Sequence, residues 1–179
     1  YNKPGNHNYS HLSSYIYTKK HLEELLHFYS SKIKIINFKL EHVFGINDSL
    51  NKFVPNLLQN LLSHKIIKLT SCEQKRDFIF CNDVVNIYEY SINNLNLFDK
   101  ITYSVGTGVS ISIKEFILTA HEIINSKSDL LFNSLMQREG EILESHADLT
   151  DLEIMSWKPK YNLKDALVKT IEFENNRIG

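Results

Sequence analysis

The sequence predicts an α/β fold in which short strands alternate with helices along the 179 residues. Three observations carry this prediction. Short, nearly continuous apolar runs indicate buried strands, and longer segments with apolar residues three or four positions apart indicate amphipathic helices. Gly, Asn and Asp stand between these segments, where the chain must turn. The content of hydrophobic residues, 42%, is sufficient for a buried core.

The expected elements follow from these patterns in chain order. Residues 1–14 are polar and rich in turn formers, so we expect a loop there. A helix is expected at about Tyr15–Ser31, because its leucines share one face with Tyr29. The apolar run Ile33–Phe38 is expected to be a buried parallel strand. The further expected elements are a helix at Phe53–His64, strands at Ile66–Leu69 and Phe78–Phe80, a helix capped by Asn82 or Asp83 that runs to about Asn94, a strand at Thr102–Val105, a helix opened by the capping box Ser112–Glu115 that runs to about Asn125, a strand at Leu130–Phe132, a short helix after Asp148, and a helix from Asn162 to about Asn175.

Charge and hydropathy exclude several classes of protein. The net charge is −1 and no basic block is present, so nucleic-acid binding is not expected. No apolar stretch is long enough for a membrane span, and residues 1–15 do not have the pattern of a signal peptide. A cytoplasmic protein with no membrane partner is therefore expected.

Cysteine and histidine spacings carry no metal-site signature. Cys72 and Cys81 match no ligand spacing, and two free thiols in a reducing cytoplasm are expected, with a disulfide left open. His7 and His11 stand in a loop-like stretch that lacks the Glu of a zinc-binding helix. No metal site is expected there.

Tyr15 and Lys19 are the first candidate catalytic pair. They are one helical turn apart and share a face. A free phenol is a poor acid–base group at neutral pH, and a nearby ammonium favours its ionised form. Such a tyrosine can pass a proton to or from a carbonyl or hydroxyl oxygen. The spacing alone arises easily by chance, and its ordinary interpretation is an exposed lysine beside a half-buried tyrosine.

The Tyr15–Lys19 pair stands in a longer block, Ser14-Tyr-Ile-Tyr-Thr-Lys-Lys-His-Leu-Glu23. This block is similar to Pro-Tyr-Gly-x-Ser-Lys-x-x-x-Glu of the extended short-chain dehydrogenases/reductases, the NAD-dependent epimerase/dehydratase family. In that family the Tyr is the catalytic acid–base, and the Lys also holds the nicotinamide ribose of NAD or NADP. The resemblance therefore implies catalytic and cofactor-binding roles for Tyr15 and Lys19.

A second block, Lys39-Leu-Glu-His-Val-Phe-Gly45, resembles the family's Arg-x-x-Asn-Val-Tyr-Gly segment at the end of a parallel strand. His42 stands at the Asn position, where family members contact the substrate or its phosphates. Lys39 replaces the Arg, and Glu41 replaces an apolar residue. The resemblance implies substrate binding by His42, and the ordinary alternative is a loop histidine with satisfied contacts.

A third block runs from Phe53-Val-Pro55 to Asp83 and is similar to the nucleotide-sugar branch of the family, which has Phe-Ile-Pro followed by Gln-x-Arg-Asp-Phe-Val-Tyr-Val-Asp-Asp-Val. The family's Arg reaches the pyrophosphate of the nucleotide sugar, and a guanidinium fork suits such a contact. This implies substrate binding by Arg76. The ordinary alternative is a surface ion pair of Arg76 with Asp77 or Glu73.

The remaining blocks lie toward the C-terminus. Arg138-Glu-Gly-Glu141 is followed by Ala147-Asp148, Trp157-Lys-Pro-Lys160 and Leu163 to Thr170, which resemble the family's Arg-x-Gly-Glu, Ala-Asp, Gly-Trp-x-Pro and Leu-x-x-Gly-Leu…Thr. By this resemblance, Arg138 adds a second positive contact to the nucleotide. We predict that Arg76 and Arg138 converge on one diphosphate.

The resemblance implies the C-terminal part of a Rossmann-type parallel sheet plus a small α/β substrate-binding domain. Residues 1–45 would supply the catalytic helix and strand of the Rossmann domain. Residues 46–179 would form mainly the substrate-binding region, with about 78–105 returning to the Rossmann sheet. The Gly-rich turn that cradles a dinucleotide is absent from the sequence, so that N-terminal half is expected to lie outside this chain. The chain alone is expected to be inactive, and the complete protein is expected to be a homodimer.

The function implied is an NAD(P)-dependent nucleotide-sugar reductase, epimerase or dehydratase. Reduction or epimerisation at C4 of an NDP-hexose is favoured, with Tyr15 as acid–base. The Lys39–Gly45 block leads further, toward reductases of CDP-4-keto-hexoses that serve O-antigen dideoxy-sugar synthesis. The alternative is a truncated, non-catalytic module that binds nucleotide sugars, or a remnant.

Overall fold

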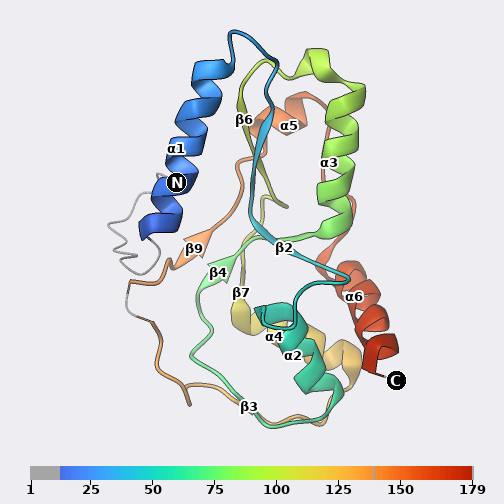
Figure 1. Cartoon of the computed structure of the whole chain (residues 1–179). Helices are drawn as coiled ribbons and strands as arrows, with labels where there is room; N and C mark the ends of the chain where they lie inside the picture. Colours follow the sequence, from blue (N-terminus) through green and yellow to red (C-terminus); the bar gives the residue numbers. More distant parts are fainter. Residues whose placement is uncertain (1–12, 139, 179) are drawn as a thin grey trace.

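Two helices enclose a parallel strand pair in one half of the molecule, the upper half in Figure 1. The computed structural model describes residues 13–138 and 140–178. Alternate side chains of a strand point to opposite faces. Accordingly, Phe38 packs edge-on against Tyr88 with ring centroids 5.1 Å apart, whereas the next residue, Lys39, forms an ion pair with Glu23 on the other side. The elements of this half are α1 (Ser13–Tyr29), β1 (Asn37–Leu40), α3 (Cys81–Asn93), the 3₁₀ turn η2 (Leu95–Leu97), β6 (Thr102–Val105), which pairs in parallel with β1, and α5 (Thr150–Ile154).

Three helices and several short strands form the other half. Helices α2, α4 and α6 pack against one another, and β2 and β5 connect the two halves. The helices are α2 (Phe53–Leu62), α4 (Ile113–Ile124) and α6 (Leu163–Ile178). The strands form a parallel pair of β2 (His42–Phe44) and β5 (Phe78–Phe80), a parallel pair of β3 (Ile67–Lys68) and β8 (Leu130–Leu131), and a sheet in which β4 (Lys75–Arg76) lies between antiparallel β7 (Ile111–Ser112) and parallel β9 (Glu144–Ser145).

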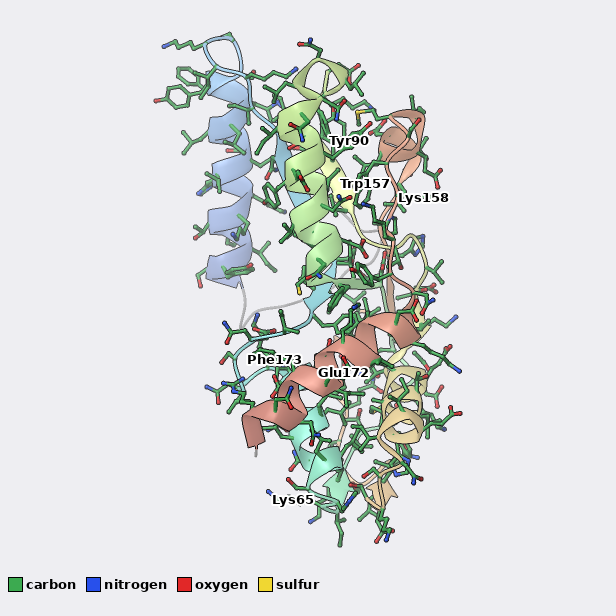
Figure 2. All side chains as sticks on the ribbon, turned by 90° about the vertical axis from the view of Figure 1, so that its right-hand side faces the viewer. Lys65, Tyr90, Trp157, Lys158, Glu172 and Phe173 are labelled. Carbon is green, nitrogen blue, oxygen red and sulfur yellow. The ribbon has the colours of Figure 1, made fainter. Side chains whose placement is uncertain are left out.

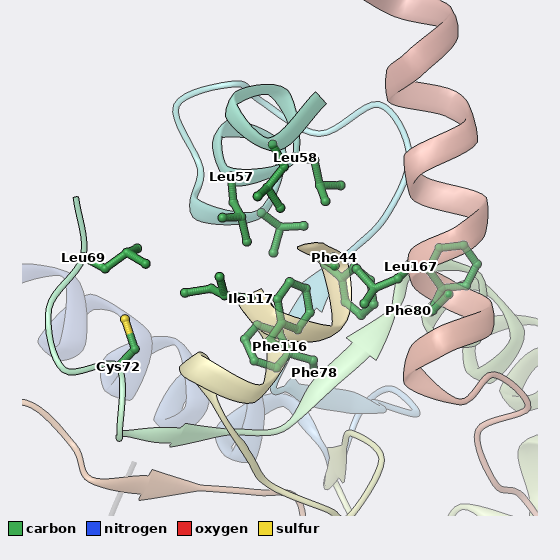
Figure 3. Close-up of a cluster of buried hydrophobic side chains, with 14 residues drawn as sticks. Phe44, Leu57, Leu58, Leu69, Cys72, Phe78, Phe80, Phe116, Ile117 and Leu167 are labelled. Atoms are coloured by element: carbon green, nitrogen blue, oxygen red, sulfur yellow. The ribbon is translucent and has the colours of Figure 1, made fainter. Parts of the chain in front are cut away.

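Strand β5 is shared by two hydrophobic cores. Phe78 and Phe80 point into one core, and Ile79, between them, points into the other. Burial on both faces explains why this strand is a continuous apolar run. The ring of Phe78 lies 4.2 Å from that of Phe116. The first core, shown in Figure 3, also contains Phe44, Leu57, Leu58 and Leu167, and the second contains Ile87, Phe98, Tyr103 and Trp157.

The segment after α5 is held against α3 by polar contacts (Figure 2). The Trp157 indole Nε1 donates to Asn86 Oδ1 at 3.1 Å. The buried Asp83 carboxylate accepts from the backbone N–H of Lys160 at 2.8 Å and of Tyr161 at 3.3 Å. These bonds fix the start of α6 relative to the upper half of the molecule.

The strand expected at Ile33–Phe38 is wrong in its position, because β1 begins only at Asn37. The N–H of Ile33 donates to the carbonyl of Tyr29 at 3.1 Å, so Ile33 still belongs to the turn that ends α1. Its side chain is 59% exposed. The apolar run therefore extends beyond the part of the chain that has a strand partner.

The expected cap of α3 by Asn82 or Asp83 is also wrong. The N-cap position is Phe80, and no side chain caps this helix. Asp83 lies in the first turn instead, where its carboxylate binds the Lys160–Tyr161 backbone. A carboxylate inside the first turn still complements the helix dipole.

The capping box of α4 is confirmed in its first half. The Ser112 hydroxyl accepts from the Glu115 N–H at 3.0 Å, and the helix ends at Asn125 with a left-handed φ of 52°. The expected loop at residues 1–14 lies mostly outside the described residues, as do His7 and His11, and residues 13 and 14 already belong to α1. The other expected helices and strands are found close to their expected bounds, whereas β2, β4, β7 and β9 were not expected.

Candidate functional site

Helix α1 carries Tyr15 and Lys19 on an accessible face. The Tyr15 side chain is 56% exposed, and Lys19 is exposed one turn later. The Lys19 ammonium lies 5.6 Å from the centre of the Tyr15 ring. The two groups that the sequence paired are therefore neighbours, and both can reach a ligand.

An ion pair holds α1 against β1. The Lys39 ammonium lies 2.6 Å from Glu23 Oε1, and the Thr102 hydroxyl approaches the same oxygen at 3.5 Å. The hydrogen bond from Lys39 lowers the pKa of the Glu23 carboxyl, against an opposing effect of partial burial. Lys39, which takes the place of the family's Arg, thus positions the helix that carries Tyr15.

His42 stands at the start of β2, immediately after the carboxyl end of β1. It is the register partner of Phe78, and the two rings lie 5.9 Å apart. The imidazole is exposed, with Nδ1 3.8 Å from Glu41 Oε2. The hydroxyl of Ser145 donates to the same Glu41 oxygen, so this corner contacts β9.

Arg76 is buried, with 7% of its surface exposed. Its Nη2 lies 3.3 Å from Glu141 Oε1, and its Nη1 donates to the carbonyl of Lys75 at 2.7 Å. The alternative ion pair with Asp77 or Glu73 is therefore wrong, because Glu141 is the partner. Sequence reasoning gave Glu141 no role, although it lies in the Arg138–Glu141 block.

Asp77 organises the loops around Arg76 and has no exposed surface. Its carboxylate accepts from the Thr107 N–H at 2.8 Å, the Thr107 hydroxyl at 2.6 Å, the Gly108 N–H at 2.9 Å and the Ala147 N–H at 3.1 Å. A Cβ on Gly106 would come within 2.3 Å of Asp77 Oδ2, so only glycine fits there. The sequence contains one signal for this hydrogen-bond cluster, an acidic residue directly before the apolar run of β5. A carboxylate buried at that position needs several hydrogen-bond donors.

Arg138 is exposed and lies in the segment between β8 and β9. Two contacts place that segment beside residues 71–76. The Ser71 hydroxyl donates to Gln137 Oε1 at 3.4 Å, and the Lys75 N–H donates to the Leu143 carbonyl at 2.7 Å. The stretches that contain Arg76 and Arg138 are thus neighbours, and their convergence on one ligand stays a prediction.

Two of the candidate residues, His42 and Arg76, are connected at the carboxyl ends of parallel strands, where ligands bind in open α/β sheets. Arg76 and Ser145 are register partners, Ser145 contacts Glu41, and His42 follows Glu41 in the chain. In Figure 1 the first turns of α1 lie at the level of β9 and β4.

Two hollows lie outside this group of residues. One of about 230 Å³ is lined by Phe78, Thr107 and Leu163 among others, and one of about 350 Å³ lies between Asn82, Glu89 and Lys160. Neither is lined by Tyr15, Lys19, His42, Arg76 or Arg138.

The described part of the chain offers little other chemistry. It contains no cluster of three or more His, Cys, Asp or Glu that could hold a metal ion. Cys72 and Cys81 are free thiols, and burial raises the pKa of the Cys72 thiol. None of the helices described is both long enough and apolar enough to cross a bilayer.

The chain is similar to known proteins over most of its length. Residues 2–106 match the model of the NAD dependent epimerase/dehydratase family. The chain is 37% identical over 171 residues to CDP-abequose synthase of Salmonella typhimurium, covering 92% of this chain and 57% of that protein. It is 30% identical over 169 residues to the CDP-abequose synthase of Salmonella muenchen, covering 93% and 58%.

Solved structures of nucleotide-sugar 4-epimerases share the fold. UDP-N-acetylglucosamine 4-epimerase of Methanobrevibacter ruminantium superposes with a TM-score of 0.75 at 22% identity, over 86% of this chain and 50% of that one. UDP-glucose 4-epimerase of Thermotoga maritima gives 0.75 at 20% identity, over 88% and 52%. The expected α/β fold with parallel strands is confirmed, and the chain spans about half the length of the relatives that it matches. The chain belongs to the NAD dependent epimerase/dehydratase family.

Proposed function

We propose that this chain supplies the acid–base pair and the substrate-binding residues of an NAD(P)-dependent enzyme that reduces or epimerises a nucleotide sugar at C4 of the hexose. The observation that carries the proposal is the 37% identity with CDP-abequose synthase over 92% of the chain. A CDP-linked 4-keto-hexose is the substrate that we place first. The division into a Rossmann part (residues 1–45 and about 78–105) and a substrate-binding part remains part of this proposal.

Tyr15 acts on the sugar oxygen. NAD(P)H, when bound, supplies the hydride for the carbonyl carbon. Tyr15 donates its phenolic proton to the C4 oxygen as the carbonyl is reduced and removes it in the reverse direction. Lys19, beside the ring, would hold ribose hydroxyls of the cofactor. The exposed face of α1 fits the cofactor because it presents the Tyr15 phenol and the Lys19 ammonium together.

Arg76, Arg138 and His42 bind the nucleotide part. A guanidinium forms two parallel hydrogen bonds with phosphate oxygens, which fixes the orientation of the ligand as well as its position. The buried Arg76 would set that position, and the exposed Arg138 would contact the diphosphate from the neighbouring segment. His42 would hold the sugar or its phosphates at the carboxyl end of β1.

The complete protein would be a homodimer that uses α1. Leu22, Leu25 and Tyr29 form an apolar face on this helix, and they are 48%, 54% and 46% exposed. Exposed apolar patches of this kind commonly mark protein interfaces. Sedimentation of the complete protein and of its Leu25→Glu variant tests this, because a charge in the apolar face of α1 should convert the dimer to monomers. A dimer that persists in the variant would exclude α1.

The test of the proposed activity uses the protein encoded by the complete reading frame that contains this chain. It is incubated with NADH or NADPH and, separately, CDP-, UDP- or dTDP-linked 4-keto-hexoses. We expect oxidation of the reduced cofactor and a product whose C4 carries a hydroxyl, identified by NMR. Tight binding of the nucleotide sugars without turnover would instead support the alternative, a non-catalytic binding module. A protein that showed neither binding nor turnover would refute both the proposed activity and the binding-module alternative.

A further inference from the structure

Arg76 already has an anionic partner from the protein itself. The Glu141 carboxylate accepts from Arg76 Nη2 at 3.3 Å and from Gln74 Nε2 at 3.1 Å, both through Oε1. Arg76 and Gln74 are more than nine-tenths buried, whereas the Glu141 side chain is 23% exposed. The carboxylate therefore occupies a hydrogen-bonding position of the Arg76 guanidinium that a phosphate oxygen could otherwise take.

The segment that carries Glu141 contacts residues 71–75 on both sides of that residue. Gln137 contacts Ser71, and Leu143 pairs with Lys75, while no helix or strand is formed in the described residues between them. Met136 and Leu143, on either side, are 95% and 71% exposed. Little of the surface of Met136 and Leu143 is buried, so a shift of these two side chains would disrupt little packing.

The polar cluster is incompletely satisfied in this arrangement. Gln74 Oε1 is buried and has no hydrogen-bond partner among the described residues. A buried acceptor without a donor costs free energy, and a ligand group that donates to it, such as a sugar hydroxyl, would remove that cost.

We infer that Glu141 is a specificity-determining residue that competes, as an internal anion, with the phosphates of the ligand for Arg76. This inference rests on the proposed function, because it takes Arg76 as the diphosphate contact. A ligand binds only the fraction of molecules in which Arg76 is open, so its apparent affinity falls by that fraction. A small anion with few contacts is thereby rejected, whereas a nucleotide sugar has further contacts with which to displace the carboxylate.

The test measures the binding of inorganic pyrophosphate, which carries the phosphates without a base or sugar, by calorimetry on the complete protein. Glu141→Gln removes the competing charge, and we expect pyrophosphate to bind it roughly 5- to 50-fold more tightly than the unaltered protein, the scale of one charge-assisted contact. Glu144→Gln is the matched control, because it removes the same charge three positions further along the chain. The Glu144 side chain is exposed and accepts a hydrogen bond from Ser110 rather than from Arg76. We expect less than about 3-fold tightening there, from the net charge alone.

The double variant Glu141→Gln/Arg76→Ala locates the effect. It should bind pyrophosphate no more tightly than Arg76→Ala alone, because the competition is for that guanidinium. Glu141→Asp, which keeps the charge and shortens its reach, should fall between the unaltered protein and Glu141→Gln, and serves if the Gln variant does not fold.

Equal or weaker pyrophosphate binding by Glu141→Gln, or equal tightening by Glu144→Gln, would overturn the inference. These results are distinguishable from a failure of the proposed function. If Glu141→Gln binds pyrophosphate more tightly but the protein turns over no nucleotide sugar, the competition is supported and the proposed activity is refuted. If the protein turns over a nucleotide sugar but Glu141→Gln binds pyrophosphate no more tightly, the proposed activity is supported and the competition is refuted.

Discussion

Two adjacent charged residues, Arg76 and Asp77, are both buried but have different tasks. Arg76 contacts a single partially exposed carboxylate, that of Glu141, which we infer that a ligand displaces. Asp77 accepts four hydrogen bonds from the loop after β6 and from Ala147, all inside the protein. We therefore expect substitution of the first to affect ligand binding and substitution of the second to affect stability.

Replacing Arg76 or Arg138 by Ala should raise KM for the nucleotide sugar by roughly 10- to 150-fold. Each charge-assisted contact contributes about 1.5–3 kcal/mol, and this range assumes that KM follows binding. Steady-state kinetics of the complete protein measure the effect. Lys75→Ala, which removes an exposed positive charge next to Arg76, is the control and should leave KM within about 3-fold. An Arg76→Ala enzyme with unchanged KM would show that this guanidinium does not bind the substrate.

Asp77→Ala should lower the free energy of unfolding by about 3 kcal/mol or more. The substitution leaves three backbone N–H groups and a hydroxyl without their acceptor, at about 1–3 kcal/mol for each group that stays buried. Urea denaturation measures the change. Asp129→Ala, at an exposed position, should remain within about 0.5 kcal/mol of the unaltered protein. A loss below about 1 kcal/mol for Asp77→Ala would mean that water replaces the carboxylate without difficulty.

At the scale of the element, the catalytic helix is joined to the sheet by the Glu23–Lys39 ion pair. The pKa of Glu23 lies below its ordinary value of 4.5 in the folded protein, chiefly through the hydrogen bond from Lys39. A carboxyl whose pKa is lowered on folding stabilises the protein above its unfolded pKa, and this contribution is lost as the pH falls through the folded pKa. The attachment of α1 should therefore weaken in acid.

Lys39→Gln should cost about 0.5–1 kcal/mol of stability at neutral pH, the range of a partly exposed ion pair. The difference from the unaltered protein should shrink as the pH falls below about 4.5 and vanish below the lowered pKa of folded Glu23, where this carboxyl is neutral in both proteins. Urea denaturation at several pH values measures this. Lys127→Gln, which alters an exposed lysine, should show no such pH dependence. A stability difference of Lys39→Gln that is constant down to low pH would contradict the role of the ion pair.

Elements whose signal is local could be predicted from the sequence. Strand β5 is a continuous apolar run because it is buried on both faces, and α4 begins at a capping Ser112 that bonds a residue three positions on. Strand β4 is two charged residues, Lys75-Arg76, and its partners are more than thirty positions away in the sequence. Nothing local marks such a strand, because only the packed molecule places its partners beside it.

The residues of the candidate site also fall into two groups, those that a local sequence block identifies and those that only the folded molecule shows. Matched blocks selected Tyr15, Lys19, His42, Arg76 and Arg138, and the structure places Tyr15 beside Lys19. The sequence could not show that Glu141 is the partner of Arg76 or that Asp77 is the centre of a hydrogen-bond cluster. The first depends on the contact of Gln74 and Arg76 with Glu141, and the second on the approach of the loop after β6 and of Ala147 to Asp77. Both are tertiary contacts.

At the scale of the whole molecule, the account requires that the first turns of α1, the end of β1 and the β4–β9 sheet act as one site. Tyr15 is the residue by which this claim is most directly tested, because it alone is assigned the proton transfer. Tyr17, on the same helix and 61% exposed, provides a matched control.

The measurement is the turnover of the nucleotide sugar by the Tyr15→Phe and Tyr17→Phe variants of the complete protein, each compared with the unaltered protein. We expect Tyr15→Phe to lower kcat by roughly 10²- to 10⁴-fold, the usual scale for the loss of a general acid, and Tyr17→Phe to change it by less than about 3-fold. A Tyr15→Phe enzyme with near-normal kcat, or equal losses in both variants, would contradict the account.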